Sequence, residues 1–137
     1  MTLHPELLTE LLELEVQVAR VALGARAGDL HLEGNYLLMT LKRDDGQWTL
    51  RLDGTHYDAQ PYDLALVDAD GKVLPFEAWM PGLAHSVHPI LNRAWACISG
   101  TAAYYCYPGH HADRWDAARF QQGADSLLAT VLRKVNP

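Results

Sequence analysis

Hydrophobic residues in the first part of the chain repeat with the period of an α-helix and form two adjacent stripes. One stripe contains Leu8, Leu12, Val16, Ala19 and Leu23, and the other contains Leu7, Leu11, Leu14, Val18 and Val21. Pro5 suits the first turn of a helix and Gly24 suits its end. We therefore predict a helix over residues 5–23. Because both stripes are apolar, we expect a broad face of this helix to be covered.

The pattern then changes to the alternation of apolar and polar positions that is typical of β-strands. The alternating segments are 35–42, 48–52 and 62–67. Asp-Gly pairs, which favour tight turns, stand at 45–46, 53–54 and 70–71. Within the first segment we expect Leu37, Met39 and Leu41 to face one side. Short strands separated by such turns predict an antiparallel meander.

A stretch without clear periodicity follows, and the chain then returns to a helical pattern. Prolines and a glycine indicate a loop over 75–89, and 94–98 reads as a short buried strand. Residues 100–109 read as irregular, and Asp113 could cap a short helix. Leu127, Leu128, Val131 and Leu132 form one stripe, which predicts a helix over 124–135. The order of N-terminal helix, antiparallel β-meander, cysteine-bearing loop and C-terminal helix predicts a single α+β domain over 1–137.

Charge and composition narrow the classes of partner. The chain carries 17 acidic and 11 basic side chains, a formal charge of −6. We expect it to bind no nucleic acid and no membrane, because phosphate-rich surfaces attract clustered Lys and Arg. Acidic residues interrupt the N-terminal segment, so we expect no signal peptide, and no apolar run reaches the roughly 18 residues of a membrane span. We therefore expect a cytoplasmic protein whose thiols stay reduced.

The candidate chemistry lies between His85 and His111. Cys97 is either a nucleophile or, since apolar residues flank it, a small buried core residue. Cys97, Cys106, His110 and His111 offer sulfur and nitrogen ligands for zinc, although their spacing matches no established zinc motif. We expect no cofactor, with a zinc ion as the alternative.

The residues around Cys97 resemble a motif of the ubiquitin-conjugating enzymes. The segment His88-Pro89-Ile90-Leu91-Asn92 precedes Ala96-Cys97-Ile98, much as a His-Pro-Asn element precedes the catalytic cysteine in that family. Gly54-Thr55-His56-Tyr57 is similar to the family's Gly and Tyr region at the end of the second strand, and Trp115 falls where a Trp often follows the cysteine. The predicted order of elements also resembles the family. The resemblance implies a UBC-like fold of prokaryotic type.

The resemblance also implies roles for individual residues. Cys97 would accept the C-terminus of a ubiquitin-like protein as a thioester. Asn92 or backbone N–H groups would stabilise the oxyanion, and His110 would transfer a proton or support the thiolate. His88 and Pro89 would be structural and hold the turn. The implied partners are a ubiquitin-activating-like enzyme and a ubiquitin-like protein of a bacterial modification system.

Two other functions remain open. Ile90 stands where the family's motif has Asn, which favours a non-catalytic UBC-like adaptor that binds a partner. A second resemblance favours a metal-binding domain: Cys97-Ile98-Ser99-Gly100-Thr101, Tyr104, Pro108-Gly109-His110 and Trp115-Asp116 are similar to a bacterial family from ubiquitin-like operons that is predicted to bind metal through Cys, Glu, His and His. The Glu and one His of that pattern would fall near Ala103 and Tyr105, so Cys97 and His110 are the ligands that match.

Overall fold

The N-terminal helix is amphipathic and uses one of its two apolar stripes for the core. The computed structural model describes residues 3–110, 113–118 and 123–135. Helix α1 spans Pro5–Leu23, and a 3₁₀ turn, Gly24–Ala27, follows it. Its buried stripe is Leu8, Leu12, Val16, Ala19 and Leu23. Leu7, Leu14, Val18 and Val21 are exposed. The helix bounds are confirmed, but the expectation of a broad covered face is wrong, because only one side of α1 packs against the core.

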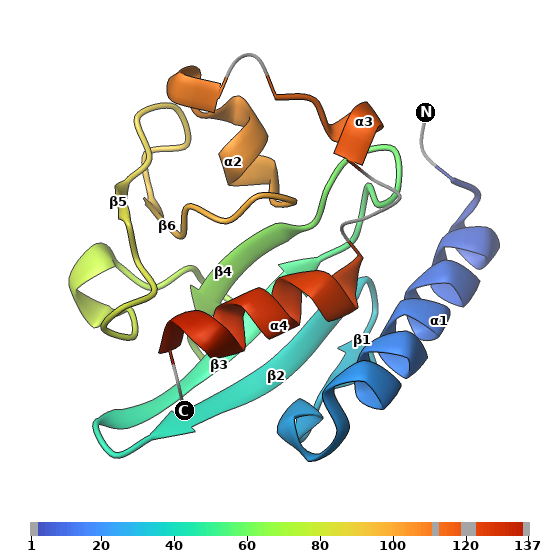
Figure 1. Cartoon of the computed structure of the whole chain (residues 1–137), viewed down its shortest axis with the longest axis horizontal. Coiled ribbons are helices and arrows are strands. Elements are labelled where there is room, and N and C mark those ends of the chain that lie inside the picture. Colours follow the sequence, from blue (N-terminus) through green and yellow to red (C-terminus); the bar gives the residue numbers. More distant parts are fainter. Residues whose placement is uncertain (1–2, 111–112, 119–122, 136–137) are drawn as a thin grey trace.

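Four strands form the antiparallel sheet that the turn signals predict. They are β1 (His31–Glu33), β2 (Tyr36–Arg43), β3 (Gly46–Asp53) and β4 (Asp63–Val67), in the order β1-β2-β3-β4 (Figure 1). In the register, Leu41 lies opposite Trp48 and Leu52 lies opposite Leu64. The meander is confirmed, and β1 is an additional edge strand that alternation did not reveal.

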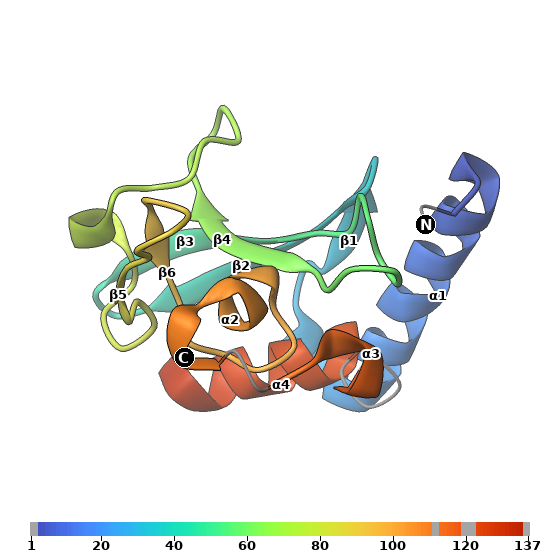
Figure 2. The same cartoon turned by 90° about the horizontal axis from the view of Figure 1, so that it is seen from above.

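The core lies between the sheet and two helices. Helix α4 spans Ala124–Val135, as predicted, and lies with α1 on one side of the sheet (Figure 2). Leu37, Met39 and Leu41 are buried on this side, which confirms the expected face of β2. The carboxylate of Glu15 on α1 accepts hydrogen bonds from the Tyr62 hydroxyl and from the backbone N–H of Ala124, both at 3.0 Å. This side chain therefore ties α1 to the start of α4 and to the sheet.

The segment between β4 and α4 is built from short elements. They are a 3₁₀ turn (Phe76–Ala78), β5 (Ser86–Val87), β6 (Ala94–Trp95), α2 (Ala102–Cys106), a 3₁₀ turn (Pro108–His110) and α3 (Trp115–Ala118). The buried strand expected over 94–98 is limited to β6. The expectation of irregular structure over 100–109 is wrong, because the Thr101 side chain accepts a hydrogen bond from the Tyr104 N–H and caps α2. Within the described part of the chain, no helix is long and apolar enough to cross a membrane.

Candidate functional site

A hairpin made by β5 and β6 carries the His-Pro segment at its tip. Val87 pairs with Ala94, and the His88 N–H donates to the Arg93 carbonyl at 2.8 Å. The Asn92 N–H donates back to the His88 carbonyl at 2.9 Å, and Asn92 has a φ of 54°. Asn is among the few residues besides Gly that adopt this left-handed conformation readily. The conformation of Asn92 therefore closes the turn.

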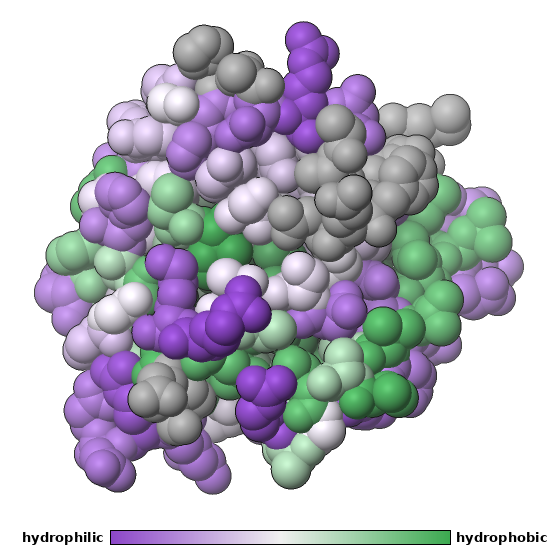
Figure 3. Space-filling model, in the orientation of Figure 1, coloured by the Kyte–Doolittle hydropathy of each residue, from purple (hydrophilic) through white to green (hydrophobic). Residues whose placement is uncertain are grey.

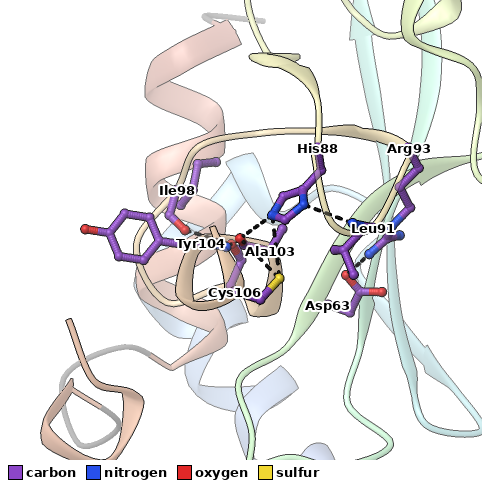
Figure 4. A network of polar contacts seen from close by, with 9 residues as sticks. Asp63, His88, Leu91, Arg93, Ile98, Ala103, Tyr104 and Cys106 are labelled. Atoms are coloured by element: carbon purple, nitrogen blue, oxygen red, sulfur yellow. Dashed lines mark hydrogen bonds and ion pairs between the residues drawn. The ribbon is translucent and has the colours of Figure 1, made fainter. Parts of the chain in front are cut away.

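The imidazole of His88 is completely buried and joins the hairpin tip to α2 (Figure 4). Its Nδ1 accepts hydrogen bonds from the backbone N–H groups of Ile90 and Leu91, each at 3.1 Å. An atom that accepts two N–H groups carries no proton, so Nε2 carries it and donates to the Ala103 carbonyl at 2.9 Å. These contacts tie the His88 side chain to the turn and to α2, and Pro89 lies in the same turn.

Cys97 follows β6 and is partly exposed, as expected for a thiol that reacts. Its neighbours Ala96 and Ile98 are buried, so the chain turns the Cys97 side chain away from the core. Burial raises the pKa of the Cys97 thiol, and the nearby Lys134 ammonium on α4 acts in the opposite direction. The pKa of the Cys97 thiol is therefore raised on balance, because the effect of burial is larger than that of the Lys134 charge.

His110 lies close to α2. Its Nδ1 is 3.1 Å from the Tyr104 carbonyl, and its ring stacks on the Tyr104 ring with 3.9 Å between centroids. A hydrogen bond to Asp113, 2.7 Å long, raises the pKa of the Tyr104 hydroxyl to about 12, with a smaller contribution from the charge of Cys97. Among the described residues, the His110 ring contacts Tyr104 and Tyr107.

Asn92 does not lie on the same part of the hairpin as Cys97. Asn92 is an exposed residue of the tip, whereas Cys97 follows the open end of β6. Asn92 lies in the turn before β6 and Cys97 lies in the turn after it, so the strand stands between the two residues along the chain. Backbone N–H groups near the thiol are a further candidate to stabilise an oxyanion.

Cys106, the second thiol, lines a pocket on the other side of the His88 imidazole. Its Sγ lies 3.5 Å from His88 Nε2 and 3.6 Å from the Ala103 carbonyl. The pocket has a volume of about 470 Å³ and is also lined by Leu91, Tyr105, Asp63 and Arg93. Asp63 and Arg93 form an ion pair (Figure 4). Burial raises the pKa of the Cys106 thiol. Sequence reasoning missed this pocket, because Asp63 and Arg93 come from segments thirty positions apart that show no common motif.

The zinc alternative gains no support from the described residues. Among them, no group of three or more His, Cys, Asp or Glu side chains could hold a metal ion. The Cys106 Sγ lies 3.5 Å from His88 Nε2. The pKa of the Cys97 thiol instead responds to the charge of Lys134. His111, the fourth candidate ligand, lies outside the described residues.

Comparisons with known proteins do not assign the chain to a family. No protein-family model matches its sequence, and no curated protein matches it significantly. The site is therefore defined by its own residues: a hairpin tip fixed by a buried His88, a partly exposed Cys97 beyond that hairpin, and Lys134, whose charge acts to lower the pKa of the thiol.

Proposed function

We propose that this chain is a ubiquitin-conjugating-like domain in which Cys97 accepts the C-terminus of a ubiquitin-like protein as a thioester. The α+β arrangement, with a helix before the meander and a helix after the cysteine, agrees with such a domain. The partners would be a ubiquitin-activating-like enzyme and a ubiquitin-like protein. No metal ion takes part in the proposed reaction.

One observation carries the proposal: a rigid His-Pro turn leads directly into a partly exposed thiol. His88 makes three hydrogen bonds with backbone groups, and these hold the turn against α2. Ala96 and Ile98 anchor the chain on both sides of Cys97 in the core. A nucleophile held in this way has a defined position, which an acyl transfer between two proteins requires.

The chemistry needs a thiolate and a carbonyl carbon. The Cys97 thiolate would attack the thioester that joins the ubiquitin-like protein to the cysteine of its activating enzyme. A new S–C bond forms, the old S–C bond breaks, and the departing thiolate takes up the proton that Cys97 released. Lys134 favours the ionised form of Cys97, whereas burial opposes it. Backbone N–H groups near Cys97 would stabilise the oxyanion.

The experiment is a reconstitution with the cognate activating enzyme, the ubiquitin-like protein and ATP. We expect a covalent adduct that reductant cleaves, and that Cys97→Ala abolishes. Cys97→Ser should give an oxygen ester that resists reductant. Cys106→Ser is the matched control, because it removes the other thiol of the chain and should leave the adduct intact. A reductant-sensitive adduct that persists in Cys97→Ala would refute the assignment.

A second candidate function is a non-catalytic adaptor with the same fold. The residue at position 90 favours it, because Ile stands there where the family's motif has an Asn. Ile90, which occupies the corresponding motif position, is 61% exposed and offers an apolar contact for a partner. An adaptor should bind the ubiquitin-like protein equally well with and without Cys97, and should form no adduct.

A further inference from the structure

Strand β1 is the short outer edge of the sheet, and few backbone contacts hold it there. Its three residues pair with the first three residues of β2. Just before the strand, the Asp29 carboxylate accepts hydrogen bonds from the Thr40 N–H at 2.7 Å and from the Thr40 hydroxyl at 2.5 Å. A strand with so short a ladder belongs to the part of a fold that opens most readily. The contacts of its side chains therefore influence how firmly β1 stays on the sheet.

The imidazole of His31 connects the residue just before this edge of the sheet to the residue that ends β1. Its Nδ1 lies 2.8 Å from the Asp29 carbonyl oxygen, and its Nε2 lies 3.2 Å from a carboxylate oxygen of Glu33. Both of these oxygens are acceptors without a hydrogen, so both ring nitrogens must donate. A neutral imidazole carries one N–H and can serve one of the two acceptors. The arrangement therefore requires the imidazolium form of His31.

The groups on the same face of the sheet favour this charged form. His31 lines a pocket of about 440 Å³ on the outer face of the sheet. The other ionisable groups of its lining are four carboxylates, one guanidinium and one phenol: Asp29, Glu33, Asp68, Asp70, Arg51 and Tyr36. Arg51 donates to the Gly71 carbonyl at 2.9 Å, and its guanidinium lies 5.0 Å from the centroid of the Tyr36 ring. Because carboxylates outnumber the guanidinium, their combined charge favours a cation at His31.

Helix α1, which lies beside β1, contributes one cation that is already engaged. Arg20 donates from Nε and Nη2 to the Leu30 carbonyl, at 3.3 and 2.8 Å. The outer edge of α1 is apolar at Val18 and Val21, and apolar residues gather along this edge in the space-filling view (Figure 3). The hydrogen bond to the Asp29 carbonyl is the largest cause that raises the pKa of His31 above its ordinary value of 6.5. The contact with Glu33 adds to this effect, and burial opposes it.

We propose that His31 is a pH-sensitive switch at the edge of the sheet: its imidazolium braces β1 at both ends, and loss of the ring proton releases one of these contacts and loosens the strand. Since the folded-state pKa of His31 is raised, the stability that this group contributes is fully present below about pH 6.5 and is lost as the pH rises through the folded-state value. Strand β1 is one wall of the outer-face pocket, so the pocket should change over the same interval of pH. The switch is independent of the thioester proposal, because it uses no residue of the β5–β6 hairpin or of the Cys97 segment.

Proton–nitrogen correlation spectra of the His31 ring, recorded between about pH 5 and about pH 9, test its protonation. We expect a titration midpoint above 6.5, with a proton on both ring nitrogens below that midpoint. Glu33→Gln keeps an acceptor oxygen but removes the charge, so it should lower the midpoint. Glu77→Gln is the matched control, because it removes the same charge from an exposed position of the 3₁₀ turn after β4 and should leave the midpoint unchanged. A wild-type midpoint at or below 6.5 overturns the proposal.

Hydrogen exchange of the Thr40 N–H tests whether the strand responds, because this group exchanges when its bond to Asp29 opens. After correction for the exchange rate of an unstructured peptide, its protection should fall about two- to five-fold between about pH 5 and about pH 8, as for loss of an exposed ion pair. The Leu74 N–H, which donates to the Leu66 carbonyl of β4, should keep its protection.

Two variants separate the switch from a general loosening of β1. His31→Gln should abolish the pH dependence of Thr40 exchange. Arg20→Gln removes the contact of α1 with the Leu30 carbonyl, so it should lower the protection of Thr40 by the same factor at both pH values. A pH response that persists in His31→Gln overturns the proposal, and so does a wild-type protein whose Thr40 protection does not change with pH.

Discussion

Replacing the buried His88 by Ala should destabilise the domain more than replacing the exposed His85 by Ala. The substitution removes the donor to the Ala103 carbonyl, which is buried. If helix α2 were longer, the Tyr107 N–H would donate to the Ala103 carbonyl. It donates to the Tyr104 carbonyl instead, so it cannot replace the lost His88 hydrogen bond. The Cys106 thiol, whose Sγ lies 3.6 Å from that carbonyl, remains as a weak donor, so the loss costs about 1–2 kcal/mol, the lower part of the range for an unsatisfied buried carbonyl.

Packing adds to this cost. The imidazole meets the ring of Trp95 edge to face at 4.9 Å and the ring of Tyr107 at 5.9 Å, and a methyl group cannot fill that space. Loss of these contacts costs roughly 1–2 kcal/mol. The N–H groups of the exposed Ile90 and Leu91 can turn to water and cost less. The expected loss is therefore about 2–4 kcal/mol of unfolding free energy, a large part of the roughly 5–15 kcal/mol of a typical domain.

Denaturation with urea, followed by circular dichroism, measures this loss. His85→Ala is the control: its exposed ring belongs to the same hairpin, contacts the Ser86 hydroxyl and stacks on the buried Trp95, so a loss of about 1 kcal/mol is expected. Two further variants divide the interaction. His88→Asn keeps an acceptor near Nδ1, whereas His88→Gln keeps a donor near Nε2, so both should fall between the wild type and His88→Ala. If His88→Ala and His85→Ala have equal midpoints, the structural role of His88 is wrong.

Three further predictions concern other residues. Lys134→Gln should raise the pKa of the Cys97 thiol and slow its reaction with a maleimide at neutral pH, whereas Arg133→Gln on the same turn of α4 should not. Burial, followed by the charge of Glu15, raises the pKa of the Tyr62 hydroxyl, so the stability that this group contributes should be fully present below about pH 10 and decline above it. Tyr62→Phe should cost about 1 kcal/mol of unfolding free energy at neutral pH and weaken the alkaline decline. Urea denaturation at several alkaline pH values measures both effects. Asn92→Gly should leave stability and thioester formation intact because Gly adopts the same φ, and loss of the adduct without loss of stability would show that the Asn92 side chain takes part in the reaction.

The elements that the sequence predicted well are those whose signal is local. Pro5 and Gly24 mark the ends of α1, and a helical repeat fills the interval between them. The predictions from sequence failed for elements whose burial or existence depends on what they pack against. The period alone cannot distinguish a stripe that faces the core from one that remains exposed, so Val21 looked as buried as Leu23. Strand β1 has three residues, too few for alternation, and it exists because β2 supplies its hydrogen bonds.

The candidate site shows the same division. The His88-Pro89 motif and Cys97 could be selected from residue types and spacing alone. The capped turn of α2 could have been found from Thr101, whose side chain is a good helix cap. The pocket beside Cys106 could not have been found from the sequence, because its ion pair joins Asp63 to Arg93, thirty positions further along the chain. Contacts between distant segments are set by tertiary packing, which no local pattern encodes.

The two thiols occupy environments that differ in chemical consequence. Cys106 lies next to an imidazole, an arrangement that would ordinarily suggest a base and its nucleophile. Nδ1 of His88 is occupied by two backbone N–H groups, and Nε2 carries a proton that it donates to the Ala103 carbonyl. This ring has no free lone pair with which to accept the thiol proton, so it does not activate Cys106. Cys97 is partly exposed, and the charge of the Lys134 ammonium lowers the pKa of its thiol, although burial raises that pKa more. The charge of Arg93 acts on the Cys106 thiol in the same direction, so a cation favours the thiolate at both positions. The imidazole beside Cys106 therefore stabilises the fold rather than the thiolate, and Cys97 is the thiol that the rigid His-Pro turn leads into.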